Sequence, residues 1–175
     1  MEQKKPMELG LQLLKDINIV RHNEFRFINA EFGFVTSFSK METTIFSVGQ
    51  PYRLQEGRIA IVTNGSARVL INLIEYIFLP DHISLIAPNS IIQIIEVSHD
   101  FAVDLNFLPI SGKEEFFTHF LQQKKNLLFP LSTEEQIQIE NFVTVMWSVL
   151  QEPVFRKEVI QHLLVGLLYN IEYIA

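Results

Sequence analysis

The pattern of apolar and polar positions changes at Pro109. Before it, short runs rich in Phe, Ile, Val and Thr are separated by Gly, Pro, Asn and Asp, which is typical of strands joined by turns. The regular turn spacing, with no helical period between the runs, predicts a sandwich or barrel rather than βαβ units. The predicted strands are residues 25–39, 58–63, 67–79, 83–88, 91–97 and 102–109.

After Pro109 the apolar residues recur at helical spacing. Ser111 precedes Glu114 by three residues, and Ser132 precedes Glu135 by three, so two capping boxes mark helix starts. Pro153 suits the first turn of a further helix, where its missing N–H is not needed. The fold class predicted is mainly β with C-terminal helices, about three in number.

The dipeptide Asn64-Gly65 lies between two alternating apolar runs. Asn-Gly favours the two positive-φ positions of a type I′ turn, so the pattern predicts a β-hairpin here. Ser66 then becomes a turn residue rather than a nucleophile, because no helix follows it. Ile59, Ile61, Ala67, Val69 and Ile71 are expected on one face of the hairpin, with Arg68 and Asn72 on the other.

The last predicted helix carries an apolar stripe that is wider than one face. Its stripe is Ile160, Leu163, Leu164, Leu167, Leu168 and Ile171, widened by Val165, Tyr169 and Ile174. Either the whole helix packs within the monomer, or one face packs on the barrel and another on a partner subunit. In the second case the dimer contacts expected are Leu164, Leu167, Leu168 and Ile171.

Composition narrows the class of protein. With 175 residues the chain can form one domain with a small appendage, and its net charge of −6 makes it a poor nucleic-acid binder by itself. It has no cysteine, which removes disulfides and thiolate chemistry and suits a reducing cytoplasm. The N-terminus does not read as a signal peptide, and no run is long and apolar enough to cross a membrane.

Candidate chemistry is sparse. The five histidines are scattered without a metal-ligand spacing, and no P-loop or nucleophile elbow is present. The neighbours Asp81-His82 and His99-Asp100 read as turn residues, because adjacent positions rarely aim at one point. No catalytic residue, metal ligand or cofactor is predicted.

The order of the strand-rich half resembles a known family. The stretch "EGRIAIVTNGSARVLIN", followed by "YIFLPDHISLIAPNSIIQI", is similar to the cupin barrel, and in particular to the N-terminal sensor domain of AraC-type transcription regulators. The resemblance covers about residues 25–175. It implies an N-terminal arm (1–19), a cupin-like β-barrel (20–109) and a helical dimerisation segment (110–175). A DNA-binding helix-turn-helix domain would lie outside this chain, and the apolar end at Ala175 agrees with a fragment.

The metal-binding motifs of cupins are not matched. If Gly65 closes the first motif, Arg58 replaces its Glu, and its two His fall on Pro51 and Arg53 or on Tyr52 and Leu54. In the second motif, alignment of Pro88 puts Ser90 on the Gly and Gln93 on the His. A guanidinium in place of a carboxylate would repel a divalent cation.

The same alignment directs Tyr52, Arg58 and Gln93 toward the barrel interior. Buried polar groups are costly without partners, so these residues are expected to bind an acidic or hydroxylated small molecule. The alternatives are that Arg58 pairs with an internal carboxylate, or that the register is shifted by one residue and Arg58 faces solvent. Three aromatic residues could floor the pocket or belong to the core: Phe27, Phe34 and Phe38.

The function predicted is ligand sensing and dimerisation in a cytoplasmic AraC-type regulator. The resemblance implies a homodimer in which an unknown small-molecule effector acts through the helices on DNA-binding domains. The alternatives are a stand-alone cupin enzyme of isomerase or dioxygenase type, and a ligand-free dimerisation module.

Overall fold

The computed structural model describes residues 4–11, 26–28, 32–39, 46–108 and 128–174. The chain forms two compact units, Met1–Leu128 and Phe129–Ala175. The first unit is built of strands and the second mainly of helices, so the predicted change from strand to helix along the chain is confirmed.

The first unit is made of short strands. They are β1 (Met7–Leu9), β2 (Arg26–Ile28), β3 (Gly33–Ser39), β4 (Pro51–Leu54), β5 (Gly57–Asn64), β6 (Ala67–Ile71), β7 (Ile74–Phe78), β8 (His82–Ile86), β9 (Ile91–Val97) and β10 (Ala102–Leu108). A further strand, β11 (Leu128–Pro130), lies at the boundary between the units. The strands predicted over 58–63, 83–88, 91–97 and 102–109 correspond to β5, β8, β9 and β10.

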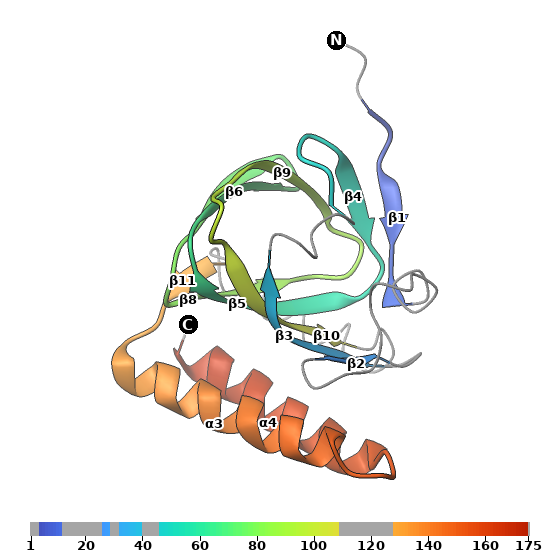
Figure 1. Ribbon diagram of the computed structural model, residues 1–175, viewed down its shortest axis with the longest axis vertical. Coiled ribbons are helices and arrows are strands. Elements are labelled where there is room, and N and C mark those ends of the chain that lie inside the picture. The colour runs from blue at the N-terminus through green and yellow to red at the C-terminus, as the bar shows by residue number, and fades with distance from the viewer. Residues whose placement is uncertain (1–3, 12–25, 29–31, 40–45, 109–127, 175) are drawn as a thin grey trace. The chain divides into compact units, whose positions relative to one another are not determined.

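The strands form two sheets that curve around a shared interior (Figure 1). One sheet has the order β1-β4-β9-β6-β7, and the other has the order β11-β8-β5-β10-β3-β2. Alternate residues of both sheets meet in one apolar cluster, called the inner cluster here. Its members are Leu9, Leu11, Val35, Tyr52, Leu54, Val62, Ala67, Val69, Ile71, Phe78, Ile86 and Ile92.

The predicted hairpin at Asn64-Gly65 is wrong. β5 and β6 belong to different sheets, so the chain turns a corner between the sheets instead of reversing direction. Gly65 has a φ of 67°, but Asn64 is not in the left-handed region, whereas a type I′ turn needs both residues there.

The corner at Gly65 packs closely on the turn between β9 and β10. The Ser66 N–H donates to Ser98 Oγ at 2.8 Å, and the Ser98 N–H donates to the Ser66 carbonyl at 2.8 Å. A Cβ on Gly65 would lie 2.6 Å from the Phe101 Cα. Both the positive φ and the close approach therefore require glycine at this position.

The hairpin lies eight residues further on, inside what the pattern predicted as one strand over residues 67–79. Asn72 and Leu73 have φ values of 49° and 70°, and β6 and β7 pair on either side of them from Ile71↔Ile74 onward. Asn72 fixes the turn to β9, because its Oδ1 accepts from the Ile91 N–H at 2.9 Å. The apolar pattern runs through this turn without a Gly or Pro, so the pattern did not reveal it.

The second unit contains α3 (Thr133–Leu150) and α4 (Lys157–Ile174). The capping box at the start of α3 is confirmed: the Ser132 N–H donates to Glu135 Oε2 at 2.7 Å, and the Glu135 N–H donates to Ser132 Oγ at 3.3 Å. α4 begins at Lys157 rather than at Pro153, which lies in the irregular connection before it.

The described residues thus hold two C-terminal helices where the sequence predicted about three. The helix predicted from Ser111 falls in residues 109–127, outside the described residues. α3 and α4 pack on each other: the Asn170 side chain donates to Gln138 Oε1 at 3.3 Å, and a Cβ on Gly166 would lie 3.1 Å from the Phe142 ring. No helix in the described part is long and apolar enough to cross a membrane.

Candidate functional site

Arg58 lies on the inner face of the barrel. It pairs with Ile86 across β5 and β8, and paired residues share a face, so Arg58 faces the side of the inner cluster. Its side chain is buried, with 3% of its surface exposed. Burial lowers the pKa of Arg58 to about 10, and the charge of Glu56 opposes this shift. The fold therefore holds a cationic group in an apolar interior.

Glu56 links this charge to the N-terminal segment. It is buried, and its Oε1 accepts from the Leu11 N–H at 2.8 Å. Leu9 and Leu11 belong to the inner cluster, and β1 pairs in parallel with β4. The predicted N-terminal arm therefore contributes a strand and two core residues, and a buried carboxylate holds the backbone just after that strand.

Ser84 is a further buried polar residue on the inner face. It is fully buried and pairs with Ala60, two positions along β5 from Arg58. Its Oγ has no hydrogen-bond partner among the described residues. Since a buried hydroxyl without a partner costs free energy, this Oγ is available to a hydrogen-bonding ligand.

Tyr52 also faces the interior, as the alignment predicted. It belongs to the inner cluster, its hydroxyl accepts from the Ser47 N–H at 2.7 Å, and its ring meets Phe46 edge to face at 5.2 Å. The Tyr52 hydroxyl is therefore held by the backbone, and the ring forms part of an aromatic wall.

The predicted orientation of Gln93 is wrong. Its neighbours Ile92 and Ile94 pack in or against the inner cluster, so Gln93 faces the other way. It pairs with Pro51 and Leu70, and its amide donates to the Gly49 carbonyl at 2.9 Å. The cause is that the alignment through Pro88 is off by one residue in β9, which moves a side chain to the other face of its sheet.

Two of the three predicted aromatic floor residues also face away from the interior. Phe34 precedes Val35 of the inner cluster, so its buried side chain lies on the opposite face of β3. Phe27 pairs with Phe34 and shares that face. Phe38 belongs to β3 and pairs with Val103, but its side chain lies outside the described residues.

The predicted dimer contacts are buried within the single chain. Leu164, Leu167, Leu168 and Ile171 are each at most 2% exposed. The structure thus corrects the assignment of these side chains to a partner subunit, because they are already covered. The centre of the stripe is thus covered within the single chain, whereas Tyr169, which widens it, is 63% exposed.

Sequence reasoning missed Glu56 and Ser84. Ser84 is a polar residue inside the apolar run "ISLI", which is a usable signal once β8 is placed beside β5. Glu56 precedes the predicted strand and gave no signal. Among the described residues, no three His, Cys, Asp or Glu side chains gather as a metal site.

Comparison with known proteins finds similarity in structure but not in sequence. No protein-family model matches the chain, and no curated protein matches it either. The AraC-like transcriptional activator CuxR shares 12% identity with a TM-score of 0.50 over 82% of this chain. This chain spans about half of that activator, 48% of its length.

Two further solved structures are similar with lower scores. Apo ToxT from Vibrio cholerae covers 83% of this chain and is covered over 57% of its own, at 11% identity and a TM-score of 0.45. A cupin 2 conserved barrel domain protein from Salinispora arenicola covers 68% of this chain and 98% of its own, at 15% identity and a TM-score of 0.36. The match to the activator shows that this chain shares its fold with an AraC-like transcriptional activator, as the resemblance to AraC-type sensor domains predicted.

Proposed function

We propose that this chain is the ligand-sensing part of a cytoplasmic AraC-type transcription regulator. Its barrel holds an acidic small molecule, and DNA is bound by a part of the protein outside this chain. The observation that carries the proposal is Arg58, a buried cation on the inner face of a barrel whose fold is shared with an AraC-like activator. The net charge of −6 agrees with DNA binding elsewhere.

The chemistry of the inner face favours an acid. A guanidinium presents several N–H donors in a fixed plane that matches a carboxylate or phosphate. Ser84 adds a buried hydroxyl on the same face, and Tyr52 adds an aromatic wall. The ligand class proposed is therefore a small anionic head on an apolar body.

The proposed action is binding without catalysis. A ligand that binds one conformation better than another shifts the population toward it, and that shift passes through the helices to the DNA-binding part. The regulator acts as a homodimer, in which the shift changes how the two DNA-binding parts are held.

A thermal-shift screen tests the proposal. The chain is mixed with small carboxylic acids and, for each one, with the matched primary amide, which has the same body and no charge. We expect some acids to raise the melting temperature while their amides do not, because a ligand stabilises the state it binds. Equal shifts for acids and amides would contradict the role of Arg58.

Ser84→Ala is the informative variant in this screen. Because its Oγ has no partner among the described residues, its loss should leave the unliganded melting temperature nearly unchanged. The rise in melting temperature caused by the active acids should be smaller in this variant.

Metal analysis of the purified protein distinguishes the proposal from the cupin-enzyme alternative, since a stoichiometric transition metal would overturn the proposal.

A further inference from the structure

Glu56 brings a second buried charge to the site of Arg58. The two side chains are 7% and 3% exposed, and only one residue separates them in the chain. Their Cα atoms are therefore at most about 7 Å apart. The charge of Glu56 acts on Arg58, since it opposes the fall in the Arg58 pKa that burial causes. The site proposed for an acid thus holds a buried anion as well as a buried cation.

The protein satisfies only one of the two oxygens of the Glu56 carboxylate. Oε1 accepts from the Leu11 N–H at 2.8 Å, whereas Oε2 is buried and has no hydrogen-bond partner among the described residues. A carboxylate oxygen can only accept a hydrogen bond, and a buried one without a donor is costly. Glu56 Oε2 is therefore a place for a donor group of a ligand.

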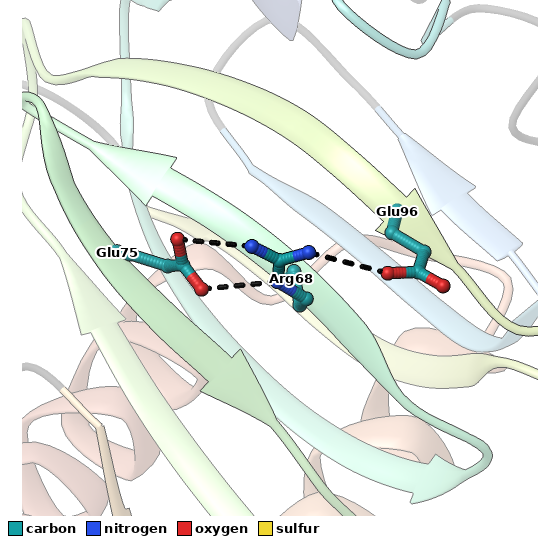
Figure 2. A network of polar contacts seen from close by, with 3 residues as sticks. All are labelled: Arg68, Glu75 and Glu96. Atoms are coloured by element: carbon teal, nitrogen blue, oxygen red, sulfur yellow. Dashed lines mark hydrogen bonds and ion pairs between the residues drawn. The ribbon is translucent and has the colours of Figure 1, made fainter.

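The ion pairs on the outer face of the barrel show the opposite arrangement (Figure 2). Arg68 donates to both carboxylate oxygens of Glu75, from Nε at 3.0 Å and from Nη2 at 3.2 Å, and its Nη1 reaches Glu96 Oε2 at 3.4 Å. Arg68 and Glu75 thus satisfy each other directly. Glu56 Oε2, by contrast, accepts no hydrogen bond from Arg58, so this oxygen remains available to a ligand.

Charge balance distinguishes between classes of acid. A simple carboxylate bound to Arg58 would add a second buried anion beside Glu56, and like charges repel strongly in a low-dielectric interior. A ligand that also carries an ammonium group avoids this cost, because the ammonium can donate to Glu56 Oε2. Two protein charges this close in the chain match a ligand whose carboxylate and ammonium share one carbon atom.

We propose that the ligand of the barrel is a zwitterion, an α-amino acid with an apolar side chain. Its carboxylate binds Arg58, its ammonium donates to Glu56 Oε2, and its side chain packs on the inner cluster. The inference rests on the proposed binding of an acid at Arg58 and narrows the class of that acid. A hydroxy acid would also offer Oε2 a donor, but it would leave the extra negative charge uncompensated and should bind less tightly.

Isothermal titration calorimetry of the chain with matched probes tests the ligand class. The amino acids are valine, leucine and phenylalanine, each compared with the acid that lacks only the ammonium group: isovaleric, isocaproic and hydrocinnamic acid. ε-Aminocaproic acid is an isomer of leucine whose two charges are far apart. We expect at least one amino acid to bind about tenfold or more tightly than its deamino acid, because a charge-assisted hydrogen bond is worth about that factor. ε-Aminocaproic acid should bind less tightly than leucine.

The outcomes separate this inference from the proposed function. If acids bind but no amino acid binds more tightly than its deamino acid, the zwitterion is overturned while the binding of acids at Arg58 stands. If neither these amino acids nor any acid of the thermal-shift screen binds, both proposals fail.

Glu56→Gln tests the role assigned to Glu56. Glutamine keeps an acceptor oxygen for the Leu11 N–H but removes the negative charge. We expect the preference for the amino acid over its deamino acid to disappear, because the ammonium loses its counter-charge. The control is Glu75→Gln, which removes an exposed carboxylate on the outer face and should leave the preference unchanged. A preference that survives Glu56→Gln would overturn the inference, and the wild-type comparison decides the ligand class even if this variant does not fold.

Discussion

Arg58 and Arg68 lie ten residues apart on consecutive strands, and their environments are opposite. Arg58 is buried on the inner face, where burial lowers its pKa to about 10. Arg68 is exposed on the outer face, where hydrogen bonds to Glu75 raise its pKa. Desolvation thus opposes the charge of Arg58, an effect that the charge of Glu56 offsets in part, whereas Arg68 stays solvated and bonded to Glu75. A cation kept in the costly place is the better candidate for a binding role.

The corner at Gly65 separates the two environments. It moves the chain from the sheet that contains β5 to the sheet that contains β6. Alternation within each strand then decides the face: Arg58 shares its face with Val62, while Arg68 lies between the inner residues Ala67 and Val69.

The largest expected effect comes from removing the buried cation. Arg58→Met leaves the buried Glu56 without its opposing charge, so we expect the free energy of unfolding to fall by about 4 kcal/mol. Urea denaturation measures this, with Arg68→Met as the matched control that should change little. Replacing Glu56 and Arg58 together should cost less than the sum of the single changes. An Arg58→Met protein as stable as the wild type would show that the two charges are not coupled.

Substitution of Gly65 at the corner should cause a smaller loss of stability, and this loss has a closely matched control. Gly65→Ala forces a Cβ against the Phe101 backbone at a φ of 67°, so we expect a loss of about 3 kcal/mol. Gly49→Ala is the control: its φ is 80°, but no other atom of the described residues lies within 4 Å of a new Cβ, so we expect about 1 kcal/mol. Thermal unfolding of both variants measures the difference, and equal losses would contradict the close packing at the corner.

The outer ion pair should give the smallest effect, and one that depends on pH. The pKa of Glu75 is lowered in the folded protein, so its contribution is present above the unfolded pKa and disappears as pH falls through the folded pKa. Glu75→Gln should therefore be slightly less stable than the wild type at neutral pH and equal to it in acid. Denaturation across this pH range measures the difference, and a gap that widens in acid would have the wrong sign.

Much of the fold could be predicted from local pattern. β8, β9 and β10 follow apolar runs bounded by turn residues, and α3 begins at a capping box that the structure contains. The missed features depend on distant contacts. β1 and β4 are short, and the Asn72-Leu73 turn has no glycine but is held by a hydrogen bond from Ile91 of another strand to Asn72.

The candidate site could be predicted only in part for the same reason. Gly65 placed Arg58 on the inner face because both residues belong to one continuous strand and its corner. Extending the register through Pro88 to Gln93 crossed a loop, where the count of residues no longer determines the face. Glu56 and Ser84 join Arg58 through the arrangement of β1, β4, β5 and β8, which local patterns do not specify.

We propose that the buried Arg58, and not the exposed Arg68, receives an acidic ligand. The most direct measurement is a nitrogen-15 NMR titration of the arginine Nε–Hε signals with the acid that stabilises the chain most. We expect the Arg58 signal to shift with saturation and the Arg68 signal to stay in place. A shift at Arg68 with Arg58 unmoved, or no acid that stabilises the chain at all, would contradict it.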